Sequence, residues 1–185
     1  MKKTGNFENT QAYGDFETLP AGGYKCVIKE VKCNEASNGK EFLKVSFDIA
    51  EGEYADFYKR KYLNDSRQDK KWSGVAAIFT EGYEPNSTNP KFKGMVTALE
   101  ESNSGYKFDW NEENMKGKKI GIVMREEEFE GYDGSIHTAT KFSRFVSYDK
   151  AEDAKIPAIK KLPEKGDAFD SFTTVSGDTG DDLPF

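Results

Sequence analysis

Residues 41–50 (EFLKVSFDIA) carry the pattern that most constrains how this chain can fold. Apolar residues occupy every second position, namely Leu43, Val45, Phe47 and Ile49. Because successive side chains of a β-strand point to opposite faces, this alternation predicts a strand with one buried face. The chain is therefore expected to build a domain around a β-sheet.

Four other segments are also predicted to be strands, because apolar residues alternate in them and turn residues bound them. They are residues 24–33, 54–63, 118–128 and 135–147. In the first of these the apolar residues change parity, which predicts a β-bulge near Lys29 or Glu30. Asn38 and Gly39 predict a tight turn between the first two strands.

Two further segments have helical periodicity. Trp72, Val75, Ala76 and Phe79 follow i, i+3, i+4, i+7 spacing and predict a helix over residues 66–80, although Gly74 weakens the pattern. A second helix is predicted to begin at a cap formed by Thr88 or Asn89, with Pro90 in its first turn. Its buried face is expected to consist of Phe92, Met95, Val96 and Leu99.

Three strands, a helical segment and two more strands follow the element order of an OB-fold, a five-stranded Greek-key barrel. We therefore expect a mainly β domain over residues 21–148, with a helical insertion between strands three and four. Residues 1–20 are expected to form an irregular N-terminal arm. Residues 149–185 have little to bury and are expected to form a flexible, disordered acidic tail.

Charge is unevenly distributed along the chain. The net charge of the 185 residues is -6, but residues 166–185 contain five aspartates and no lysine or arginine. The other 165 residues hold 27 basic and 28 acidic side chains, so the body is nearly neutral. A nearly neutral body can carry a basic stripe on one face, which leaves nucleic-acid binding open.

The sequence lacks the common motifs of catalytic and metal-binding sites, which excludes several classes of function. The sequence has no Walker loop, no set of zinc ligands and no Ser or Cys nucleophile motif with a partnering base, so no catalytic residue, metal or cofactor is expected. It also has no apolar run long enough to cross a bilayer and no signal-peptide-like start. A cytoplasmic protein without membrane contact is therefore expected.

The segment 57–62 (FYKRKY) contains the densest mixture of basic and aromatic residues. Single-stranded nucleic acid is bound by cations that follow the phosphates and by aromatic faces that stack on the bases. On the predicted third strand, Tyr58, Arg60 and Tyr62 would share one face, which we interpret as a DNA-binding face. Lys59 and Lys61 would then extend past the rim of the barrel or follow a bulge. The alternative is a solvated edge strand whose basic residues discourage aggregation.

Other candidate DNA-binding residues lie on neighbouring strands. Phe42 and Lys44 point away from the predicted core and could lie beside Tyr58 and Arg60. Lys141 and Arg144 on the predicted fifth strand could continue the same groove.

The chain ends in an unusual pentapeptide, Asp181, Asp182, Leu183, Pro184 and Phe185. Phe185 combines an apolar ring with the terminal carboxylate, which suits a pocket that has an apolar floor and an arginine at its rim. Pro184 restricts the backbone, and the two aspartates would steer the tip toward a basic surface. These five residues are the candidate partner-binding site.

The chain resembles single-stranded DNA-binding proteins of the phage type, found in Gram-positive bacteria or their viruses. The resemblance is carried by residues 19–24 (LPAGGY), 38–45 (NGKEFLKV) and 47–55 (FDIAEGEYA), and by the DDLPF end. It implies an OB-fold and sequence-tolerant single-stranded DNA binding in replication, recombination or repair, in a bacterial cell or a phage-infected host. It also implies that the tip recruits a helicase, primase, polymerase, recombinase or nuclease. A homo-oligomer is possible, and monomer, dimer and tetramer all stay open.

Two other functions compete with this interpretation. A β-rich phage adaptor or virion protein would have no affinity for DNA. A metal-dependent nuclease would need carboxylates such as those of residues 126–128, although three acidic residues at a strand end usually form a solvated rim.

Overall fold

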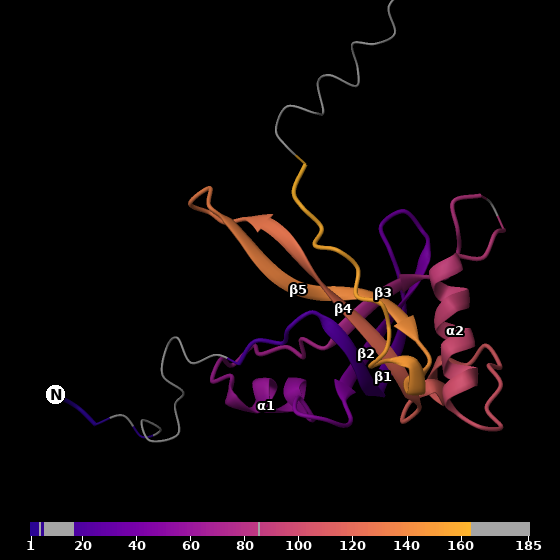
Figure 1. Cartoon of the computed structure of the whole chain (residues 1–185), viewed down its shortest axis with the longest axis horizontal. Helices are drawn as coiled ribbons and strands as arrows, with labels where there is room; N and C mark the ends of the chain where they lie inside the picture. The colour runs from indigo at the N-terminus through magenta and orange to yellow at the C-terminus, as the bar shows by residue number, and fades with distance from the viewer. Residues whose placement is uncertain (4, 6–16, 85, 164–185) are drawn as a thin grey trace, which may run out of the picture.

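Within the described part of the chain, the fold consists of five antiparallel strands and two α-helices (Figure 1). The computed structural model describes residues 1–3, 5, 17–84 and 86–163. The strands are β1 (Gly22–Glu35), β2 (Glu41–Ile49), β3 (Val75–Phe79), β4 (Lys119–Glu130) and β5 (Ile136–Val146). The helices are α1 (Phe57–Asn64) and α2 (Pro90–Ser102), with short 3-10 turns η2 (Glu112–Met115) and η3 (Tyr148–Lys150). The prediction of a mainly β chain is confirmed.

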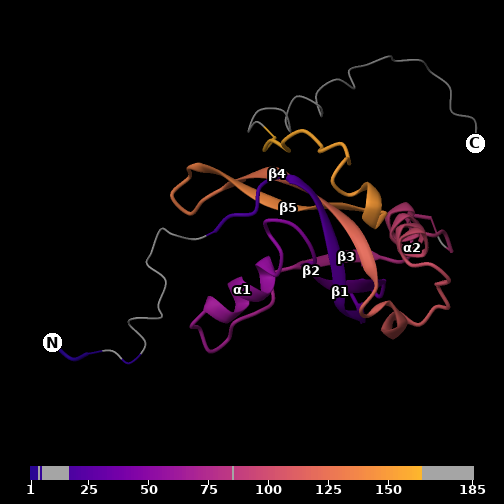
Figure 2. The same cartoon turned by 60° about the horizontal axis from the view of Figure 1, so that its bottom comes forward.

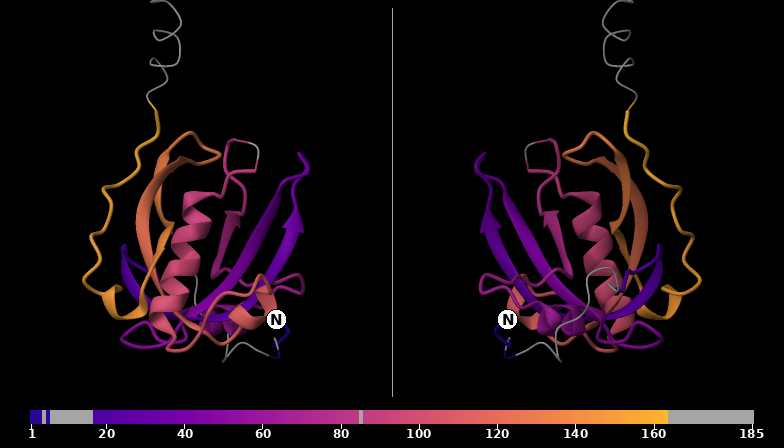
Figure 3. Two further views of the ribbon diagram at one scale, coloured as in Figure 1. Left: turned by 90° about the vertical axis from the view of Figure 1, so that its right-hand side faces the viewer. Right: turned by 90° about the vertical axis from the view of Figure 1, so that its left-hand side faces the viewer.

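The strands form one sheet in the order β3-β2-β1-β4-β5. The central strand β1 therefore pairs with β2 on one side and with β4 on the other. Figure 3 shows that the sheet curves strongly, so that the β1–β2 hairpin forms one wall and the β4–β5 hairpin the other, with α2 between them. Figure 2 shows α1 and α2 at opposite ends of this curved sheet.

The core lies on the inner face of the curve. Its fully buried side chains include Val45, Phe47 and Ile49 of β2, as their alternation predicts. Helix α2 also follows the prediction: the Asn89 side chain accepts a hydrogen bond from the Lys91 amide at 2.9 Å, and Pro90 is in the first turn. Its buried residues include all four of the predicted face, Phe92, Met95, Val96 and Leu99.

Two local features of the first hairpin are also confirmed. The β1–β2 register shifts between Ile28 and Glu30, where the parity change predicts a bulge. Gly39 lies in the turn with φ 77°, a conformation that glycine adopts without strain.

The predictions for residues 54–80 are wrong: the expected third strand is the helix α1, and the expected helix contains the strand β3. Helix α1 begins where β2 supplies acceptors, because the buried Asp48 carboxylate accepts hydrogen bonds from the amides of Tyr58 (3.0 Å) and Lys59 (3.2 Å). Residue 74 must be glycine, because a Cβ there would lie 2.5 Å from the Phe47 carbonyl oxygen and 2.7 Å from the Tyr58 ring. Gly74 thus lets β3 start against β2.

Residues 151–163 follow β5 and return along β4. The Lys160 amide donates to the Glu126 carbonyl, and the Glu128 amide donates to the Lys160 carbonyl. This part of the predicted tail therefore contacts the sheet. None of the helices in the described ranges has the length and apolarity that crossing a membrane requires.

Candidate nucleic-acid interface

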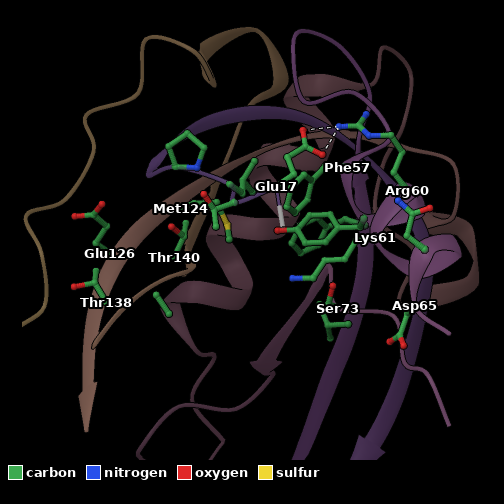
Figure 4. A pocket seen from close by; sticks show the side chains of 18 of the residues that line it. Glu17, Phe57, Arg60, Lys61, Asp65, Ser73, Met124, Glu126, Thr138 and Thr140 are labelled. Carbon is green, nitrogen blue, oxygen red and sulfur yellow. Dashed lines mark hydrogen bonds and ion pairs between the residues drawn. The ribbon is translucent and has the colours of Figure 1, made fainter. Parts of the chain in front are cut away.

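A pocket of about 1100 Å³, here called the seam pocket, lies between the two edge strands, β3 and β5. These strands do not pair with each other in the part of the chain that the structure describes. Residues 17–20, helix α1 and the start of β3 form one side, and the β4–β5 hairpin forms the other (Figure 4). The pocket is lined by Phe57, Tyr58, Arg60, Lys61, Ser73, Val75, Met124, Glu126, Thr138, Ala139 and Thr140, among others.

Three of the predicted DNA-binding residues, Tyr58, Arg60 and Lys61, line the seam pocket together. Tyr58 is only 6% exposed, and its ring packs edge-on against Phe47 at 5.4 Å and against Phe57 at 5.1 Å. Burial raises the pKa of the Tyr58 hydroxyl, because an apolar environment disfavours the charged form. The exposed stacking face predicted for Tyr58 is therefore wrong, and this residue forms part of the packed wall of the pocket.

The basic side chains of the seam pocket are largely paired with carboxylates. Arg60 donates to both carboxylate oxygens of Glu17, at 2.8 and 2.9 Å (dashed in Figure 4). Arg67 bonds Asp65 at 2.6 Å, which lowers the pKa of Asp65 to about 2. Lys61 has no ion pair with any described residue and lies 5.9 Å from the centre of the Phe57 ring. A phosphate entering this pocket would meet Lys61 directly and would compete with Glu17 for Arg60.

Lys59 and Tyr62 do not line the seam pocket, because they lie on other sides of helix α1. Lys59 lies 3.8 Å from the Asp56 carboxylate at the exposed start of α1. Tyr62 packs against Trp72 with ring centres 5.9 Å apart, and Lys70 lies 4.7 Å over the Tyr62 ring. The predicted shared face of Tyr58, Arg60 and Tyr62 is therefore wrong, since it required a strand.

A second group of predicted residues lies on the outward face of β2 and β3. Phe42 and Phe79 are partners in the β2–β3 register, and their ring centres are 5.7 Å apart. Lys44 faces Lys32 on β1, and both lysines are exposed. We call these four residues, Lys32, Phe42, Lys44 and Phe79, the strand patch. It combines two adjacent aromatic rings with two lysines on a sheet surface, of which Lys32 lies 3.1 Å from the Glu30 carboxylate.

Phe79 and Lys32 are not among the binding residues that the sequence predicts. Phe79 was placed on the buried face of a helix, but on β3 it is 40% exposed. The alternation of buried Ala76 and Ile78 with exposed Ala77 and Phe79 was a possible signal, although five residues are too few to outweigh the helical spacing.

The strand β3 connects the strand patch to the seam pocket. Val75 at the start of β3 lines the pocket, and Phe79 at its end belongs to the patch. Four residues of strand span about 13 Å. One nucleic-acid strand running along β3 could therefore contact both regions.

Lys141 and Arg144 do not join this surface. Lys141 lies 3.9 Å from the Glu127 carboxylate, and Arg144 donates to the Lys155 carbonyl at 2.8 Å. Neither lines the seam pocket, so the predicted continuation of the groove through them is wrong. The predicted partner-binding residues Asp181, Asp182, Leu183, Pro184 and Phe185 lie outside the described residues.

Within the described ranges, no group of three or more His, Cys, Asp and Glu side chains is arranged to hold a metal ion. Cys26 is buried and Cys33 exposed, and both are free thiols.

Comparison with protein families gives a match to part of the chain. The sequence profile of a family described as "Protein of unknown function (DUF669)" matches residues 5–77. This range contains β1, β2 and α1, and it ends within β3, before Phe79. No curated protein matches the chain. Over residues 5–77 the chain is thus similar to that family, and this range includes Phe42, Lys44 and the α1 side of the seam pocket.

Proposed function

We propose that this protein binds single-stranded DNA without sequence preference, through the strand patch and the α1 side of the seam pocket. Half-buried Phe42 and exposed Phe79 form a pair of adjacent rings with Lys32 and Lys44 beside it, and this pair is the observation that carries the proposal. Stacking of a base on an aromatic side chain contributes ~1–3 kcal/mol, and every base offers a face for it. Two stacking rings and a few phosphate contacts are therefore enough for useful, sequence-tolerant affinity.

We also propose that the sheet is a partly open OB-fold barrel. In the order β4-β1-β2-β3, the fourth strand returns by a long connection to lie beside the first, which is the arrangement of a Greek key. Helix α2 lies between the third and fourth strands, where the OB-fold order places its helix. OB-folds bind oligonucleotides on the face of strands two and three. The strand patch lies on that pair of strands.

The C-terminal pentapeptide has a separate role in this proposal. Its aspartates, proline and terminal phenylalanine suit capture by a basic, apolar pocket on another protein. The tip would recruit a DNA-processing protein, such as a helicase, primase, polymerase, recombinase or nuclease, while the sheet holds DNA.

Fluorescence titration with oligo-dT and with a duplex of equal length, at two salt concentrations, tests the function. We expect the single strand to quench the Tyr and Trp emission and to bind more tightly than the duplex. The logarithm of affinity should fall with the logarithm of salt concentration at a slope of about −0.7 per phosphate neutralised. Absence of oligo-dT binding would favour the adaptor or virion protein, and cleavage of DNA with Mg²⁺ or Mn²⁺ would favour the nuclease.

Substituting Glu17 with glutamine should strengthen DNA binding. The change removes the carboxylate that pairs with Nη2 of Arg60 at 2.8 Å, so this end of the guanidinium can contact a phosphate while Nη1 still donates to the Ala55 carbonyl. We expect an affinity increase of roughly 2- to 10-fold at low salt and a salt slope steeper by about 0.7, as one extra phosphate contact implies. The oligo-dT titration measures both.

Glu101→Gln is the matched control for this variant. Glu101 lies 3.4 Å from Lys150 and does not line the seam pocket, so the substitution changes the net charge equally but frees no cation there. Equal gains in the two variants would show that only net charge matters, and would contradict a role for Arg60 in DNA binding.

A further inference from the structure

Trp110 stands out on the surface away from the proposed DNA interface. It lies in the loop between α2 and η2 and is 77% exposed. Its backbone φ is 64°, in the left-handed region that a bulky residue rarely adopts. Strain of this kind costs free energy and is concentrated at functional sites, so it makes Trp110 a candidate for a functional role.

Hydrogen bonds within the loop and contacts with neighbouring rings hold Trp110 in place. Asp109 accepts hydrogen bonds from the Asn111 amide at 3.2 Å and from the Asn114 side chain at 2.7 Å. The indole contacts Phe108 with ring centres 5.4 Å apart and Phe92 of α2 at 6.2 Å. The ring is therefore a fixed part of an aromatic cluster whose base is α2.

A pocket of about 350 Å³ lies beside this cluster, between the β1–β2 hairpin and the loops on either side of α2. Its apolar side consists of Leu43, Phe92, Phe108 and Trp110. Its acidic side consists of Glu41, Glu81 and Glu112. Among the described residues that line it, none is a lysine or an arginine. We call it the Trp110 pocket.

The three carboxylates of the Trp110 pocket differ in their pairing from those of the seam pocket. No described lysine, arginine or histidine forms an ion pair with Glu41, Glu81 or Glu112, in contrast to the seam pocket. Their charges also affect the neighbouring Cys33. Burial raises the pKa of its thiol, and the negative charges of Glu41 and Glu112 raise it further. The pocket therefore combines an exposed indole with carboxylates that no described cation pairs with.

We propose that the Trp110 pocket binds an arginine side chain presented by a protein partner. A guanidinium is planar and always charged, so it can stack on the indole and donate hydrogen bonds to a carboxylate at the same time. A phosphate would be repelled by the three carboxylates, so this pocket does not suit DNA. The chain's own residues 166–185 lack lysine and arginine, so they cannot supply the cation.

This site is distinct from the proposed DNA interface although both involve β2. Glu41 lines the Trp110 pocket, whereas the adjacent Phe42 belongs to the strand patch. Consecutive side chains on a strand point to opposite faces. The partner and DNA can therefore be bound together, and neither proposal depends on the other.

Titration of the full chain with two short peptides tests the proposal at 150 mM salt. One peptide carries a single central arginine between glycines, and the other carries uncharged citrulline in its place. We expect the arginine peptide to bind at least about tenfold more tightly, because cation–π stacking and charge-assisted hydrogen bonds both require the charge. Calorimetry gives the affinities, and a change in Trp fluorescence reports contact with the indole.

Matched variants locate the site. Glu112→Gln should weaken the arginine peptide about fivefold or more, whereas Glu113→Gln, an equal charge change in the same turn outside the pocket, should leave it unchanged. Trp110→Gly, which suits the positive φ, should weaken it about fivefold or more. All three variants should retain the oligo-dT affinity of the parent protein.

Three results would overturn the proposal: equal affinity for the two peptides, no measurable binding of the arginine peptide at millimolar concentration, or equal losses in Glu112→Gln and Glu113→Gln. Absence of oligo-dT binding by the parent protein would instead contradict the proposed function and leave the peptide result interpretable by itself.

Discussion

Replacing both Phe42 and Phe79 with alanine is expected to weaken binding of oligo-dT roughly 100-fold, because each ring supplies ~1–3 kcal/mol of base stacking. The two rings are partners across β2 and β3, at a ring-centre distance of 5.7 Å, so adjacent bases of one strand can use both. The salt slope should change little, since no phosphate contact is removed. Titration by fluorescence at two salt concentrations measures both quantities.

The fold should tolerate this double substitution, because both rings lie on the outward face of the sheet. Phe129→Ala is a suitable control: Phe129 is as exposed as Phe79 but lies outside the strand patch and the seam pocket. Thermal denaturation of each variant checks that the sheet is intact. If the double variant is folded and binds oligo-dT as tightly as the parent, the strand patch is not the DNA-binding surface.

Asp48→Ala is expected to lower the free energy of unfolding by about 3 kcal/mol or more, the cost of leaving buried polar partners unsatisfied. Asp48 is 0% exposed and accepts hydrogen bonds from the amides of Ile49, Tyr58 and Lys59 at 3.0, 3.0 and 3.2 Å. Burial raises the pKa of Asp48, while the three amide donors act in the opposite direction. Without the carboxylate, the first turn of α1 loses its acceptors. Urea denaturation gives the free energy of unfolding.

Asp56→Asn separates this effect from a general loss of charge at the start of α1. Asp56 has an exposed ion pair with Lys59 at 3.8 Å and a φ of 56°, which asparagine also accepts. Its loss should cost less than about 0.5 kcal/mol, as is usual for an exposed pair. A loss of comparable size in the two variants would contradict the structural role assigned to Asp48. Asp48→Asn should be intermediate, because its amide oxygen can still accept a hydrogen bond.

The candidate surface was only partly predictable from the sequence. Phe42 and Lys44 were identified because alternation along β2 places them opposite the buried residues Leu43 and Val45. Their partner Phe79 could not be identified, because its exposure depends on which strand lies beside β2. The position of Tyr58 also depends on tertiary contacts. Alternation predicts that its ring faces solvent, but on helix α1 the ring packs against Phe47.

Local pattern alone determined β1 with its bulge, β2, α2 and the β4–β5 hairpin, since each has a long periodic segment or explicit turn and cap residues. Only the tertiary structure decided residues 54–80. There the buried carboxylate of Asp48 favours a helix in a segment that alternates like a strand, and the close approach of Gly74 to Phe47 favours a strand in a segment spaced like a helix. Such short segments gain too little from their own periodicity to determine their conformation, so contacts with residues distant in sequence decide it.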